Sequence, residues 1–198
     1  GAEMLGHAME GVAYKKMNRD DDAAKALAAA TALYEEAGGK VPLEVAMDVA
    51  KACLTTGNKE KGSAMMRDIV RNHHDDDEVL SQVAGVYEAA NLQDEGRDII
   101  ASTRAEIVNV NNKGVTLVKE RKLKEAIEFF QQAAEGLPDN KIIIRNAALA
   151  FIMYMESNGR DDKLLYQARR YLERCQRLDP ANMQNEELMK RYKGLAAA

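Results

Sequence analysis

The sequence predicts an all-α protein built from stacked helical hairpins. Three observations support this fold: helical periodicity along most of the chain, short breakers between the periodic segments, and small residues that recur at a fixed spacing. Residues 44–54, 78–90 and 124–135 carry apolar side chains at i, i+3, i+4 and i+7, which is the stripe of an amphipathic helix. None of the sequence shows the alternation of apolar and polar residues that is typical of a half-buried strand.

Short polar segments separate the periodic ones. They lie at residues 18–22, 38–42, 55–59, 73–77, 138–140, 158–162 and 179–182. The intervals between them are long enough for helices of about 12 to 15 residues, and short connections of this kind join antiparallel neighbouring helices. The chain is therefore predicted to fold as a series of hairpins.

Composition excludes several classes of protein. Hydrophobic residues make up 46% of the chain, aromatic residues only 5%, and the net charge is −4 with acids and bases mixed. Nucleic-acid binding would require a basic face, so no nucleic-acid partner is expected. No apolar run approaches the roughly 18 residues that span a bilayer, so we expect neither membrane insertion nor a signal peptide. The two cysteines, Cys53 and Cys175, are too few for a disulfide framework and indicate a reducing cytoplasm.

The clearest repeat unit lies at residues 110–138. Its pattern is Val110-x2-Lys113-Gly114-x2-Leu117, then Ala126-x3-Phe130-x2-Ala133, then Pro138. This pattern resembles the tetratricopeptide repeat (TPR) family, whose unit of about 34 residues runs aromatic-x2-Leu-Gly-x2-Tyr, then Ala-x3-Phe-x2-Ala, then Pro. The resemblance implies a right-handed solenoid of helical hairpins, in which small residues lie where the two helices of a hairpin approach most closely.

Similar units recur along the chain. In the first four, two small residues lie 12 positions apart: Gly11 with Ala23, Ala50 with Gly62, Ala84 with Gly96, and Gly114 with Ala126. A fifth unit pairs Ala148 with Ala168, and we expect its extra residues to form a long turn at 156–165. The resulting prediction is about five repeats and a C-terminal capping helix at 186–195, with repeat boundaries near 4–37, 43–76, 77–106, 107–140 and 141–182.

The repeat spacing departs from 34 residues in two places. It is 39 between the first and second repeats, where residues 38–42 lengthen the turn, and 30 between the third and fourth. Neither Gly nor Pro interrupts residues 97–113 at the shorter joint. We therefore predict a continuous or kinked helix across residue 107, which divides the array into residues 1–106 and 107–198.

Two charged clusters could be mistaken for catalytic sites. The run from His73 to Asp77 contains metal-ligating residue types, but neighbouring residues on one loop rarely converge on an ion. We interpret it as a solvated turn whose Asp caps the next helix, and the run Asp20 to Asp22 in the same way. Cys53 and Cys175 fall at core positions. No phosphate loop, nucleophile elbow or zinc-protease motif is present, so no cofactor, no metal and no enzymatic activity are predicted; the rival hypothesis is a metal hydrolase at His73 and His74.

The concave groove of a TPR array, lined by the first helix of each hairpin, is where the resemblance implies that a protein or peptide segment binds. The candidate groove residues are Lys15, Lys51, Asn111, Asn112, Lys119, Arg145, Asn146 and Met153. Asn112 and Asn146 lie 34 residues apart, so they are expected to form a ladder that grips a peptide backbone, because an amide both donates and accepts hydrogen bonds. The alternative is that these residues cap turns or are simply polar. Lys119 and Arg145 would add a carboxylate contact, but the full basic clamp that binds heat-shock-protein tails is not matched.

A second resemblance covers residues 111–180. Its motifs are Asn112-Lys113-Gly114-Val115, Glu125-Ala126-Ile127-Glu128-Phe129-Phe130, Pro138-Asp139-Asn140-Lys141, Ile144-Arg145-Asn146-Ala147-Ala148 and Ala168-Arg169-Arg170-Tyr171-Leu172-Glu173. They are similar to the TPR output region of bacterial response regulators in two-component systems. The resemblance implies signal transduction by protein contact. The alternative is a TPR chaperone for a secretion or pilus assembly system, and a homodimer is left open.

Overall fold

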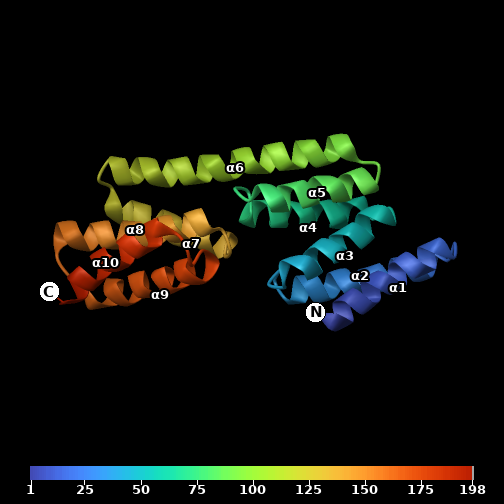
Figure 1. Cartoon of the computed structure of the whole chain (residues 1–198), viewed down its shortest axis with the longest axis horizontal. Helices are drawn as coiled ribbons and strands as arrows, with labels where there is room; N and C mark the ends of the chain where they lie inside the picture. The colour runs from blue at the N-terminus through green and yellow to red at the C-terminus, as the bar shows by residue number, and fades with distance from the viewer. Residues whose placement is uncertain (198) are drawn as a thin grey trace. The chain divides into compact units, whose positions relative to one another are not determined.

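The computed structural model describes residues 1–197, and this part of the chain contains helices and turns without strands. Ten helices follow one another through the described residues (Figure 1): α1 (Ala2–Lys16), α2 (Asp20–Glu36), α3 (Leu43–Thr55), α4 (Lys59–Asn72), α5 (Asp77–Ala89), α6 (Gln93–Lys119), α7 (Leu123–Gly136), α8 (Lys141–Asn158), α9 (Asp162–Leu178) and α10 (Met183–Ala197). The fold is all-α with helices packed as hairpins, consistent with a TPR-type helical solenoid.

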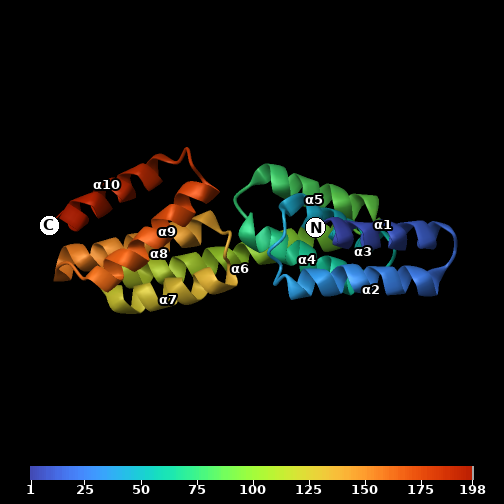
Figure 2. The ribbon, with the colours of Figure 1, turned by 90° about the horizontal axis from the view of Figure 1, so that it is seen from below.

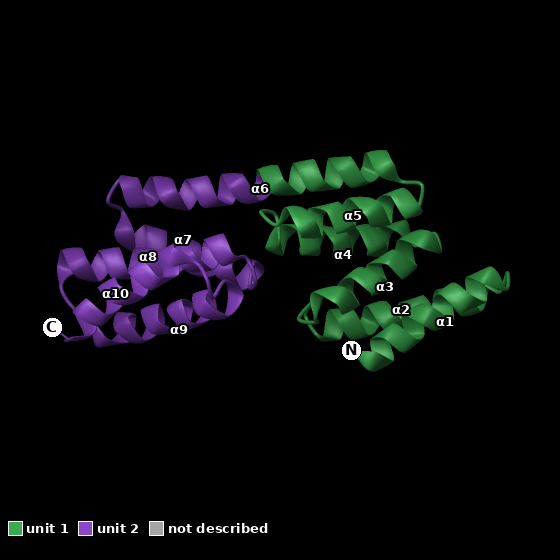
Figure 3. Ribbon diagram, in the orientation of Figure 1, with its two compact units in different colours: residues 1–105 green, residues 106–198 purple. Residues whose placement is uncertain are grey.

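The chain divides into two compact units, residues 1–105 and 106–198, and the boundary lies within α6 (Figure 3). Helix α6 is a single helix of 27 residues. Unit 1 thus ends with the first part of α6, and unit 2 begins with its second part. The boundary lies close to the junction expected at residue 107, while the division of the units into three and two repeats stays a prediction.

Each unit has its own apolar core. In unit 1, α1 packs against α2 and α3, and α3 packs against α4 and α5 (Figure 2). The side chains that are fully buried there include Val49, Cys53, Met66, Val70, Val83 and Tyr87. In unit 2, α8 packs against α7, α9 and α10. Its core includes Phe130, Ile143, Ile144, Ile152, Phe151 and Leu172.

The first four hairpins share one type of turn. Three residues separate the two helices of each hairpin, and the middle residue has a left-handed backbone conformation. These middle residues are Asn18 with φ 59°, Gly57 with φ 94°, Asn91 with φ 58° and Arg121 with φ 62°. The third residue then donates its N–H to a carbonyl five residues earlier, as Lys122 N does to Leu117 O at 3.0 Å. This 6→1 bond is the one that closes a Schellman motif. Because the turns recur at intervals of 39, 34 and 30 residues, they follow the spacing seen in the sequence.

Small residues allow close helix contact inside these hairpins. A Cβ atom at Gly11 would lie 2.6 Å from Leu27 Cγ across α1 and α2, and one at Gly114 would lie 2.3 Å from Phe130 Cζ across α6 and α7. Ala126 is fully buried beside the second of these contacts. Ala84 differs, because it is exposed on α5. The prediction of a buried small residue at position 84 is therefore wrong, since the buried face of α5 includes Val79, Leu80, Val83, Val86 and Tyr87.

The fifth hairpin has a short turn, so the long turn predicted at 156–165 is wrong. Helix α8 continues to Asn158 and α9 begins at Asp162. The extra residues lengthen the two helices because no breaker precedes Gly159, which ends α8 with φ 92°. Asp161 then caps α9 by accepting hydrogen bonds from the backbone N–H groups of Lys163 at 2.9 Å and Leu164 at 3.0 Å.

The C-terminal helix α10 packs on α8 and α9. Its Leu188 is buried, and Tyr192 and Leu195 lie against the same core. Helix α10 begins at Met183, three residues before the segment predicted to form it. Over residues 1–197, none of the helices combines the length and the apolar character that crossing a bilayer requires.

Candidate functional site

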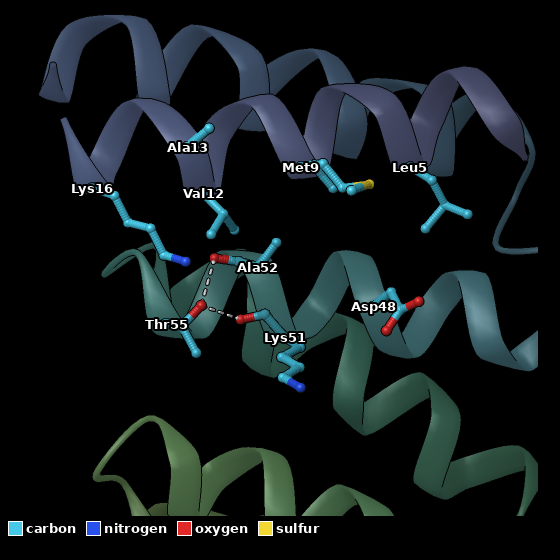
Figure 4. A pocket seen from close by; sticks show the side chains of 10 residues that line it. Leu5, Met9, Val12, Ala13, Lys16, Asp48, Lys51, Ala52 and Thr55 are labelled. Atoms are coloured by element: carbon cyan, nitrogen blue, oxygen red, sulfur yellow. Dashed lines mark hydrogen bonds between the residues drawn. The ribbon is translucent and has the colours of Figure 1, made fainter.

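Unit 1 contains a groove between α1 and α3, the first helices of its first two hairpins (Figure 4). We call it the α1–α3 groove. Its walls carry Leu5, Met9 and Val12 from α1 and Ala52 from α3, and its volume is about 540 Å³. That volume lies within the range of ligand pockets, about 300–1,000 Å³. The groove is therefore large enough to take several side chains of a partner.

Charged side chains border this apolar groove. Lys16, Asp48 and Lys51 line it and are exposed, and the charged groups of their side chains form no ion pair or hydrogen bond within the described chain. Lys15, which the sequence also suggested, lies outside the groove and pairs with Asp20 at 2.9 Å, between Nζ and Oδ1. Of the two unit 1 candidates, only Lys51 therefore reaches the groove.

Unit 2 brings two of its predicted amides together. Asn146 on α8 donates from Nδ2 to Oδ1 of Asn111 on α6 at 2.6 Å, and both residues are half-buried. Asn112 is exposed and makes no such bond. Asn111, and not its neighbour Asn112, therefore bonds Asn146, because one residue along a helix turns the side chain by about 100°. The peptide-binding ladder of Asn112 and Asn146 stays a prediction.

Unit 2 also contains a hollow, which lies between α8 and α10 and has a volume of about 350 Å³. Arg145, Asn146 and Leu149 line it from α8, facing Gln184 and Arg191 of α10. Arg145 makes no ion pair within residues 1–197. The other two candidates, exposed Lys119 and half-buried Met153, do not line this hollow. Lys119 and Arg145 are therefore not brought into one pocket.

Both cysteine thiols lie in the helical cores. Cys53 is 0% exposed and Cys175 is 1% exposed. Burial raises the pKa of each thiol to about 11. A thiol nucleophile acts as its thiolate, so these positions favour packing over catalysis.

The turn that contains His73 and His74 is organised by helix capping. Asp76 Oδ1 accepts hydrogen bonds from the backbone N–H groups of Glu78 at 3.1 Å and Val79 at 3.2 Å. The predicted cap is confirmed, but the prediction of a solvated turn is wrong at His74, which is 6% exposed. In the described part of the chain, no three His, Cys, Asp or Glu residues group closely enough to hold a metal ion.

The acidic run at the start of α2 does not cap that helix. The N-cap is Arg19, without a side-chain cap, and Asp20 to Asp22 form the first turn. The predicted N-cap role is therefore wrong. Acidic residues in a first turn still complement the positive end of the helix dipole.

Sequence reasoning missed the apolar wall of the α1–α3 groove. Leu5, Met9 and Val12 follow the spacing i, i+4, i+7 on α1, one position along from Met4, Ala8 and Gly11, which are buried. Leu5 and Val12 also pack partly against the unit 1 core, whereas Met9 is exposed. The available signal was that apolar residues occupy a wider face of α1 than the single stripe of an amphipathic helix.

Comparison with known families gives one match. The tetratricopeptide repeat family model matches residues 110–135, which cover the second part of α6 and most of α7. The matched segment is the unit with the clearest pattern in the sequence, and it supports a TPR family for this chain. No curated protein and no solved structure matches the chain.

Proposed function

We propose that this chain is a non-catalytic scaffold that binds a segment of a partner protein on the faces formed by the first helices of its hairpins. The matched repeat supports this coarse function, because TPR repeats mediate protein–protein interactions. The observation that carries the proposal is the amide pair of Asn111 and Asn146.

The pair keeps hydrogen-bonding capacity for a ligand. Asn146 and Asn111 use one donor and one acceptor on each other, and neither amide makes another hydrogen bond within the described chain. One NH2 group and one carbonyl oxygen therefore remain on half-buried side chains, whichever way the amides are turned. These are the groups that recognise the backbone of an extended peptide, and Arg145 beside them would attract a carboxylate.

Photocrosslinking in cells tests this proposal. A benzoylphenylalanine residue replaces Asn112, beside the amide pair, or Glu128 on α7 as the control position. We expect an adduct with a partner from position 112, and we expect it to weaken when Asn111 and Asn146 are both changed to Ala. Equal adduct formation from position 128 would contradict a role for the amide pair in binding the partner. Adducts that persist in a double variant of normal helicity would contradict it as well.

The finer assignment rests on the residue pattern of 111–180 alone. On that pattern we propose the output region of a bacterial two-component response regulator, acting in the cytoplasm. A reading frame that encodes a phosphoacceptor receiver upstream of residue 1 would support it. Neighbouring secretion or pilus genes without a receiver would support the alternative of a TPR chaperone, and sedimentation of the purified chain tests the homodimer.

The rival hydrolase proposal is tested by metal analysis of the purified protein and of its His73→Ala and His74→Ala variants. Asp76 already serves as the cap of α5. We expect no stoichiometric ion in the wild type. An ion that is lost in either variant would overturn the non-catalytic assignment.

A further inference from the structure

We infer that the α1–α3 groove binds an amphipathic helix of a partner, antiparallel to α1 and α3, with acidic residues in its first turn. The inference rests on the proposed function, because it names the kind of segment that the scaffold would hold. It concerns unit 1 only, so it is separable from the amide pair of unit 2.

The apolar side chains of the groove recur along α1 at the spacing by which one helix packs against another. Leu5, Met9 and Val12 lie on one stripe of α1, and Ala52 faces them from α3. Met9 is 72% exposed and lies among the other apolar side chains that line the groove. A helix lies in such a groove with anchors at i, i+3, i+4 and i+7, and the flexible thioether of Met adapts to the anchor beside it.

The charges of the groove are arranged along its length. Figure 4 shows Leu5 of α1 and Asp48 of α3 toward one end, and Lys16 of α1 reaching toward Thr55 of α3 at the other. Lys51, which also lines the groove, precedes Thr55 by one helical turn. Because Lys16, Lys51 and Asp48 have no ion pair within residues 1–197, their charges are available to a ligand. A complementary segment is therefore acidic near the two lysines and basic near Asp48.

The direction of the ligand helix follows from the same arrangement. Residue numbers of α1 and α3 increase in the same direction along the groove, so Lys16 and Thr55 mark the C-terminal ends of both helices (Figure 4). An antiparallel ligand places its N-terminus at this end. Acidic residues stabilise a helix N-terminus and basic residues a C-terminus, so the charges that suit the groove also suit the ligand helix itself.

Two synthetic peptides provide the probe. Both carry three Leu at i, i+4 and i+7 on an Ala background and a hydrocarbon staple on the opposite face, so that circular dichroism shows equal helicity. The first has two Glu in its first turn and two Lys in its last turn, and the second has these charges exchanged. Fluorescence anisotropy of the labelled peptides with the full chain measures both affinities.

We expect the acid-first peptide to bind more tightly, by on the order of five- to tenfold at low salt, with the difference shrinking at high salt. The Lys16→Glu, Lys51→Glu double variant should invert this preference. Met9→Gln should weaken both peptides, whereas Met17→Gln, at a residue that is 63% exposed outside the groove, should weaken neither. Equal affinity for the two peptides, absence of binding, or indifference to Met9→Gln would each overturn the inference.

A unit 2 control separates this inference from the proposed function. Asn146→Ala should leave peptide affinity unchanged, because Asn146 belongs to the other unit. Peptide binding that fails while position 112 still crosslinks a partner would refute the helix-in-groove inference alone. Loss of peptide affinity in Asn146→Ala would refute the assignment of the peptide to the α1–α3 groove.

Discussion

Arg191 on α10 holds Glu156 on α8 through two hydrogen bonds, from Nε to Oε1 at 2.8 Å and from Nη2 to Oε2 at 2.6 Å. This bidentate geometry is the strongest form of a side-chain ion pair. It joins the last helix of unit 2 to the C-terminal part of α8, and Arg191 also lines the hollow beside Asn146. Its consequences are measurable because the carboxylate titrates.

The first prediction concerns the acid dependence of this pair. Hydrogen bonding from Arg191 lowers the pKa of Glu156 from its ordinary value of 4.5. The stabilisation is therefore fully present above about pH 4.5 and is lost as the pH falls through the folded pKa. Glu156→Gln should lower the urea midpoint at pH 7, and its difference from the wild type should close in acid.

The matched control for that experiment is Glu128→Gln, at an exposed residue of α7 without a partner in the described chain. It should change the midpoint little at either pH. A gap between wild type and Glu156→Gln that stays constant down to pH 3 would show that the ion pair does not stabilise the native state.

The second prediction concerns the left-handed turn residue Arg121. Its φ of 62° is costly for a side chain with a Cβ atom, whereas Gly57 occupies the equivalent place in the α3–α4 turn without that cost. Arg121→Gly should raise the free energy of unfolding by about 0.5–1 kcal/mol, measured in urea. Arg121→Ala should bring no comparable gain, and equal stability of the two variants would argue against backbone strain at this turn.

The third prediction compares two glycines of unit 1. A Cβ atom at Gly96 would lie 2.6 Å from Tyr87 Cβ, which cannot move without its helix, so Gly96→Ala should cost about 1–3 kcal/mol. Gly85 lies inside α5 with open space around it. Gly85→Ala should instead gain roughly 0.5–1 kcal/mol from helix propensity. Thermal unfolding followed by circular dichroism distinguishes them, and a stabilised Gly96→Ala variant would mean that α5 and α6 approach less closely than described.

The fourth prediction concerns thiol reactivity. Cys53 and Cys175 are enclosed in the cores and their thiols have pKa values raised to about 11 by burial, so the native protein should not react with Ellman's reagent at pH 8. Both should react once urea unfolds the chain. Ala28→Cys, at an exposed position of α2, should label at once and serves as the positive control. Rapid labelling of the native wild type would show that a core opens locally.

The sequence was sufficient to predict where hairpins occur, because apolar stripes and turn residues are local signals. Gly114 and Ala126 show this, since their spacing marks the contact of α6 with α7. The fifth hairpin was predicted wrongly because counting extra residues does not reveal whether they continue a helix. In the structure α8 continues to Asn158, so the extra residues lengthen this helix instead of forming a loop.

The candidate sites were less predictable, because they depend on helix rotation and on neighbours distant in sequence. Whether Asn111 or Asn112 bonds Asn146 depends on how α6 is rotated about its axis, and the two residues differ by a single step of that rotation. His74 could be recognised as buried only once the helices around its turn were placed. The groove beside Met9 belongs to two helices, and α1 alone shows only that its apolar surface is wide.

Helix α6 runs without interruption from unit 1 into unit 2, so its backbone hydrogen bonds continue across the boundary. A helix terminus leaves four N–H or four C=O groups without partners, and no such terminus exists between residues 105 and 106. Separating the units there would create two bare ends, each needing a new cap. Either unit made alone would therefore carry a helix terminus that the full chain does not have at this place.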